Sequence, residues 1–193
     1  VHAIEAYTSR LRKNPISDNL ARSALVLLSR NIRTAVQEGG NREARSAMLL
    51  GAMQAGQAFA NAPVAAVHAL AYPLGGHYHI PHGLSNSLVL PSVLAFNAPA
   101  ASGLYAELAE LVVGRPVAGS DEAKTQALIA ALRELIDDVA LPATLSAAGV
   151  RADDIDRLAE DALLQQRLLV NNPRELALED ARAIYRAAYG DAA

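Results

Sequence analysis

The chain has 193 residues, of which 52% are hydrophobic and 19% are charged, and its formal net charge is −3. This composition predicts a single folded domain with a substantial core, and the small net charge gives no reason to expect nucleic acid or an anionic membrane as a partner. Because the sequence contains no cysteine, disulfides, thiolate metal ligands and a cysteine nucleophile are excluded, which agrees with a cytoplasmic location.

The predicted elements are helices throughout. A first helix is expected over residues 17–40, with a capping serine or aspartate at its start and a Gly-Gly pair at its end. A second is expected over residues 41–62, with Asn41 as its N-cap. Apolar periodicity predicts further helices at residues 101–113, 120–141, 153–165 and 178–189. Because alternating strand patterns and Asn-Gly hairpins are absent from the sequence, we predict an all-α domain of about eight to ten helices over residues 1–193.

Four of the five histidines of the chain lie in the segment VHALAYPLGGHYHIPHG, residues 67–83. Pro73 disfavours a helical conformation at Tyr72, and the following Gly-Gly pair permits a sharp reversal of the chain. Pro81 suits the first turn of a new helix. We therefore expect a helix that ends near Tyr72, a loop of about eight residues, and a helix that begins near Pro81.

This turn would bring two of the histidines together. In one continuous helix His68 and His82 would lie about 21 Å apart, whereas a helical hairpin lets both face one point as ligands of a single metal ion. His77 and His79 lie in the expected loop, where contact with solvent or substrate is as compatible with their position as metal binding is. His2 is a third ligand candidate, far away in the sequence. Spacing alone leaves two interpretations open, a metal site or histidines that cap helices and form hydrogen bonds.

Three stretches carry a resemblance to a known family. The string HALAYPLGGHYHIPHGLSNSLVLPSVLAFN, residues 68–97, closely resembles the signature segment of the iron-containing (group III) alcohol dehydrogenases. Residues 1–10, VHAIEAYTSR, and residues 171–185, NNPRELALEDARAIY, are similar to two other stretches of that family's helical C-terminal domain. The resemblance covers essentially the whole chain and implies the helical domain of the dehydroquinate synthase-like fold.

The resemblance also implies a metal site and a missing part. Members of the family hold a divalent ion, usually Fe(II), with one aspartate and three histidines, and these histidines match His2, His68 and His82. The aspartate would stand four residues before His2, so the chain is expected to be a fragment that lacks this ligand and the N-terminal α/β domain that binds NAD or NADP. The ion, Fe(II) or Zn(II) in its place, would act as a Lewis acid while hydride passes between alcohol and nicotinamide.

Three further positions are candidates for the active site. Tyr72 stands where family members commonly have a histidine near the nicotinamide, and we predict that it donates or relays a proton, although tyrosine is the poorer base at neutral pH. Phe59 matches an aromatic residue that lines the substrate pocket in relatives, with packing in the core as the alternative interpretation. His77 is a candidate substrate-binding residue on the expected loop.

The prediction is thus the metal-binding catalytic domain of an NAD(P)-dependent alcohol dehydrogenase, inactive when isolated as this fragment. Its expected partners are a small alcohol or aldehyde and further copies of itself, with no nucleic acid and no membrane. Maleylacetate reductase and a zinc-dependent polyol dehydrogenase, such as glycerol dehydrogenase, are alternatives in the same superfamily. A non-catalytic helical module that stores or senses metal is the alternative from another class.

Overall fold

The computed structural model describes residues 1–190. Nine α-helices and one 3-10 turn follow one another in this part of the chain, and no strand occurs in it, which confirms the all-α prediction. The elements are α1 (His2–Tyr7), α2 (Pro15–Gln37), α3 (Arg42–Asn61), α4 (Ala66–Tyr78), α5 (His82–Val113), α6 (Asp121–Asp138), η1 (Ala152–Asp154), α7 (Ile155–Leu163), α8 (Gln166–Leu169) and α9 (Leu178–Tyr189).

Local capping signals explain where several helices begin. Asn41 caps α3 as predicted, because its side chain accepts a hydrogen bond from the backbone of Ala44. Ser120 caps α6 in the same way. The predicted start of α2 was wrong by about a turn, since Asn14 rather than a later serine or aspartate is the cap and Pro15 occupies the first helical position.

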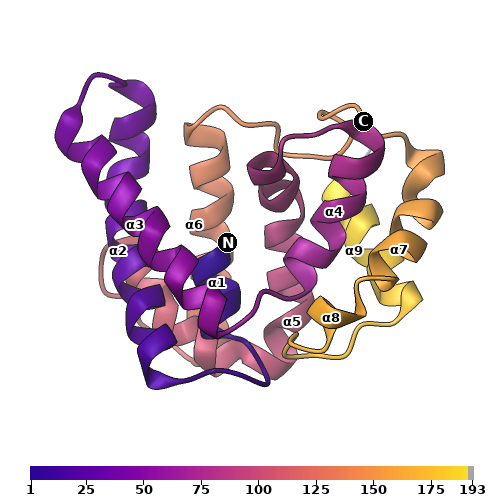
Figure 1. The fold of residues 1–193 in the computed structure, drawn as a ribbon, viewed down its shortest axis with the longest axis horizontal. Coiled ribbons are helices and arrows are strands. Elements are labelled where there is room, and N and C mark those ends of the chain that lie inside the picture. Colours follow the sequence, from indigo (N-terminus) through magenta and orange to yellow (C-terminus); the bar gives the residue numbers. More distant parts are fainter. Residues whose placement is uncertain (191–193) are drawn as a thin grey trace.

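The long helix α5 is the centre of the fold, and α2, α4, α6 and α9 pack around it (Figure 1). The helix predicted at residues 101–113 is the last part of α5. Within the described residues α5 is the one helix that is long and apolar enough to cross a membrane, but 44% of its most apolar window is buried inside the protein. Its apolar character therefore also serves the core.

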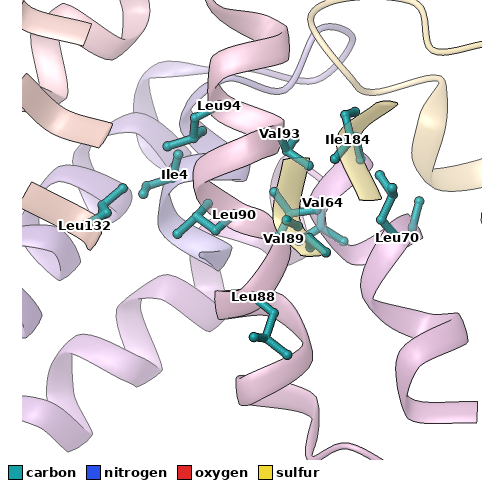
Figure 2. Packing of buried hydrophobic residues seen from close by; sticks show 14 of the residues in the cluster. Ile4, Val64, Leu70, Leu88, Val89, Leu90, Val93, Leu94, Leu132 and Ile184 are labelled. Atoms are coloured by element: carbon teal, nitrogen blue, oxygen red, sulfur yellow. The ribbon is translucent and has the colours of Figure 1, made fainter. Parts of the chain in front are cut away.

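Figure 2 shows how α5 joins two halves of the hydrophobic core. Side chains one turn apart share a face of a helix, so Leu90 and Leu94 face one way from α5 while Val89 and Val93 face another. On one side of α5, buried aliphatic side chains meet residues of α1 and α6, and on the other side they meet α4, α9 and the segment before α4. The residues of the first group are Leu90, Leu94, Ile4 and Leu132, and those of the second are Val89, Val93, Val64, Leu70 and Ile184.

Helix α4 corrects the predicted turn. It does not end near Tyr72 but continues through Pro73 and the Gly-Gly pair to Tyr78, so that His79–Pro81 alone connects α4 with α5. Proline lacks the N–H that the preceding turn would accept and crowds that turn. The Tyr185 hydroxyl of α9 donates a hydrogen bond of 2.6 Å to the carbonyl of Leu70, which gives this turn a donor from outside the helix.

Candidate metal centre

Three histidines from three helices meet at one point. His2 is the first residue of α1, His68 lies in the first turn of α4, and His82 is the first residue of α5. Their potential ligand nitrogens all lie within 4.8 Å of one another, and Nε2 of His68 is 3.1 Å from Nε2 of His2. The structure thus brings together the three histidines that were predicted as ligands, although α4 and α5 meet through a shorter connection than expected.

The donor set fits a divalent ion of the borderline class. Two imidazole nitrogens that both bind one ion at about 2.1 Å lie about 3.0–3.4 Å apart, which is the range of the His2–His68 separation. Three neutral imidazoles leave a divalent ion with its full positive charge and with free coordination positions. His68 is buried whereas His82 is exposed, so the cluster is closed on one side and accessible on the other.

Burial and mutual repulsion favour the neutral form of two of the imidazoles, those of His2 and His82. The pKa of His2 is lowered to about 4, mainly because the half-buried ring loses water and also because a charged His68 or His82 would repel it. Desolvation, and then repulsion by His68, likewise lowers the pKa of His82. The neutral form is the one that binds metal, so at neutral pH these two rings present free lone pairs.

A buried glutamate holds the central histidine. Glu5, one turn after His2 on α1, is only 4% exposed. Its Oε2 lies 2.6 Å from Nδ1 of His68, and its Oε1 accepts a hydrogen bond of 2.7 Å from the backbone N–H of Val67. We did not predict this role from the sequence. The available signal was a glutamate among the apolar residues of α1, on the helix face of His2.

Asn86 accompanies His82 on α5 and was also missed. It lies one turn further along the helix and is buried, and its side-chain Nδ2 donates a hydrogen bond of 2.8 Å to the carbonyl of His82. The same Nδ2 is 3.2 Å from Nε2 of the His82 ring. The spacing of four residues was the signal that could have indicated this contact.

Two aromatic residues border the histidine cluster. Phe59, on α3, is half-buried, and the centroid of its ring lies 4.6 Å from the centroid of the His2 ring. Tyr72, on α4, is exposed. The centroid of its ring lies 6.2 Å from the ring centroid of His82 and 6.4 Å from that of His68. Both therefore lie where a molecule bound at the histidines would meet an aromatic wall and a hydroxyl, and their roles stay predictions.

The other two histidines of the segment do not join the cluster. The predicted loop position of His77 was wrong, because His77 belongs to the last turn of α4 and its Nε2 lies 2.5 Å from Oδ2 of Asp161 on α7. This contact directs the ring toward α7, so the geometry gives no support for a substrate-binding role. His79 is exposed and ends α4 in a left-handed conformation with φ of 54°.

Comparison with known proteins decides the family. The model of the Fe-containing alcohol dehydrogenase family, C-terminal, matches residues 1–189. The chain belongs to this family. Long-chain-alcohol dehydrogenase 1 of Geobacillus thermodenitrificans is 40% identical to this chain over 188 residues, which are 97% of the chain and 47% of that relative. The 1,3-propanediol dehydrogenase of Klebsiella pneumoniae is 39% identical over 189 residues, 97% of the chain and 48% of the relative.

Solved structures give the same assignment. The crystal structure of a 1,3-propanediol oxidoreductase superposes on this chain with a TM-score of 0.93 and 39% sequence identity, and covers 97% of the chain. The match occupies 49% of that structure. The predicted family and its helical fold are confirmed, and the chain spans about half the length of the relatives that it matches.

Proposed function

We propose that this chain is the metal-binding catalytic half of an NAD(P)-dependent alcohol dehydrogenase that interconverts an alcohol and an aldehyde or ketone. The observation that carries the proposal is the meeting of His2, His68 and His82 nitrogens within 4.8 Å, at a cluster open on one side. Because the relatives are about twice as long, we further propose that an α/β half outside these residues binds the dinucleotide. Homo-oligomers and a cytoplasmic location belong to the same proposal.

Each residue at the cluster has a task in this proposal. Fe(II), or Zn(II) in its place, supplies a Lewis acid when bound, which makes an alcohol hydroxyl more acidic or polarises a carbonyl in the reverse direction. His2, His68 and His82 would hold the ion. Phe59 offers an apolar surface beside His2 for the carbon chain of the substrate, and the Tyr72 hydroxyl relays the proton toward solvent.

The relatives support this reaction over the alternatives. The two curated relatives named above are an alcohol and a diol dehydrogenase, and the matching family model is that of Fe-containing enzymes. A maleylacetate reductase structure also matches, but at 29% identity, below the 40% and 39% of the two dehydrogenases. None of these three is a protein that only stores or senses metal, and neither dehydrogenase is described as zinc-dependent.

Single alanine variants of the intact protein test the proposal. His68→Ala and His82→Ala each remove a ligand, so we expect both to lose most of the metal and at least ~1,000-fold in alcohol oxidation, because the Lewis acid is worth several kcal/mol. His79→Ala, on the same segment but outside the cluster, is the matched control and should keep its metal and its alcohol oxidation. Metal per chain and NAD(P)-linked oxidation of primary alcohols are the measurements. Full metal content and activity in His68→Ala would refute the assignment.

A further inference from the structure

We propose that Glu5 is a positioning residue that fixes the ring orientation and tautomer of His68, so that Nε2 of His68 presents a lone pair to the metal. The proposal rests on the proposed function, because it assigns His68 as a ligand. It concerns a side chain that would not touch the metal itself. Glu5 is not one of the three residues whose ligand atoms form the cluster. It lies on the other side of the His68 ring, next to Nδ1.

The two carboxylate oxygens of Glu5 have separate partners. Oε1 accepts a hydrogen bond from the N–H of Val67, in the first turn of α4, and Oε2 contacts Nδ1 of His68. The residue before α4, Ala65, has no side chain that could cap the helix. Glu5 therefore supplies from α1 the acceptor that a capping residue would normally supply, and a negative charge at a helix N-terminus is favourable.

These contacts determine which nitrogen of His68 carries the proton. A carboxylate only accepts hydrogen bonds, so the contact of 2.6 Å requires Nδ1–H on His68. Nε2 is then the unprotonated nitrogen, and it is the one that lies 3.1 Å from Nε2 of His2 inside the cluster. A metal-bound histidine whose other nitrogen donates to a carboxylate is a common arrangement, and loss of such a partner typically weakens metal binding 10–100-fold.

The backbone contact makes glutamine an informative substitution. The N–H of Val67 can only donate, so in Glu5→Gln the amide oxygen must stay on Val67 and the NH₂ group must face His68. That NH₂ group donates to Nδ1 and forces the proton onto Nε2, where it blocks the metal. Glutamine thus preserves the shape and the cap while it inverts the tautomer of His68.

The experiment compares Glu5→Gln with Glu5→Ala in the intact protein. Alanine leaves space for water, which can still accept from Nδ1–H, but it removes the cap and opens a cavity. We expect Glu5→Ala to lower the urea midpoint more than Glu5→Gln. We expect the opposite order for Zn²⁺ affinity, with dissociation constants raised about 10-fold in Glu5→Ala and about 100-fold in Glu5→Gln. A merely structural role would give the same order in both measurements.

A spectroscopic measurement reads the tautomer directly. In metal-free protein labelled with ¹⁵N-histidine, Nε2 of His68 should resonate as an unprotonated nitrogen in the wild type and as a protonated one in Glu5→Gln. Glu107→Gln is the matched control, because Glu107 is a carboxylate that accepts from Tyr7 of the same helix α1 but lies outside the cluster. It should leave Zn²⁺ affinity and the His68 signals unchanged.

The outcomes separate this proposal from the function on which it rests. Wild-type Zn²⁺ affinity and an unchanged His68 tautomer in Glu5→Gln would overturn the positioning role alone, provided that His68→Ala still loses its metal. A wild-type protein that binds no stoichiometric metal would overturn the proposed function, and the positioning role with it.

Discussion

At the scale of single residues, Ala140 occupies a backbone conformation that suits glycine better. It follows α6 with a φ of 54° and is exposed. Its N–H donates to the carbonyl of Asp137 at 2.9 Å, and the N–H of Leu141 donates to that of Ile136 at 3.1 Å. This pair of hydrogen bonds is the Schellman arrangement, in which glycine usually takes the left-handed position because a Cβ costs about 1–2 kcal/mol there.

Ala140→Gly is therefore expected to raise the free energy of unfolding by about 1 kcal/mol, because it relieves this strain at a modest cost in chain entropy. Ala130→Gly is the matched control, since Ala130 is an exposed residue within α6 and should lose about 1 kcal/mol on the same substitution. Urea unfolding of both variants measures the difference. Equal destabilisation by the two substitutions would contradict the interpretation that the backbone at Ala140 is strained.

The same scale shows what the sequence could predict of the site. The histidines at positions 68 and 82 were recognisable because they lie on one short segment that is rich in proline and glycine, whereas the distant candidate His2 was supported by the resemblance. Glu5 was not recognisable as their support, because its partners lie more than 60 residues further along the chain. That a glutamate is buried, and which group faces it, depends on how α1 packs against α4.

At the scale of elements, α4 illustrates how tertiary contacts override local signals. Proline and two glycines predict a loop after Tyr72, which was wrong: the helix continues to Tyr78, where α5 and α7 pack against α4 and Tyr185 of α9 donates to the carbonyl of Leu70. The helices that begin at Asn41 and Ser120 were predicted well, because their caps lie within three residues of the groups that they satisfy.

This interpretation of α4 predicts the effect of a single hydroxyl. Tyr185→Phe removes the donor to a carbonyl within a buried helix and should lower the free energy of unfolding by about 1–3 kcal/mol. Tyr189→Phe on the same helix is the control, since the Tyr189 hydroxyl donates no hydrogen bond within residues 1–190, and its effect should stay below about 0.5 kcal/mol. Chemical denaturation compares them. A loss in Tyr185→Phe no larger than in the control would show that the contact does not support α4.

At the scale of the whole molecule, α5 ties the parts together. It holds a proposed ligand, His82, at its first residue and carries buried side chains over most of its length, between α1 and α6 on one side and α4 and α9 on the other. The all-α class was predictable because helical periodicity recurs along the sequence. The central place of α5 was not, since two internal prolines, Pro91 and Pro99, make its 32 residues look like separate helices.

Two tyrosines buried in this core predict how the molecule responds to alkaline pH. Tyr105 on α5 and Tyr185 on α9 are 1% and 0% exposed, and burial raises the pKa of both phenols above the usual value. In the unfolded chain these phenols lose their protons near pH 10. Above that pH the folded state binds more protons than the unfolded state, so stability is complete below about pH 10 and falls as the pH rises, by about 1.4 kcal/mol per pH unit for each such tyrosine.

Tyr105→Phe tests this dependence because it removes one of the two phenols. The variant should lose stability less steeply than the wild type between pH 10 and 11.5, by about 1.4 kcal/mol per pH unit, since one proton fewer separates its two states. Urea unfolding at four or five pH values gives both slopes, and comparison within one protein pair cancels the contribution of lysines and of the other tyrosines. Parallel slopes would mean that Tyr105 ionises as easily in the folded protein as in the unfolded chain, and would contradict the effect assigned to its burial on α5.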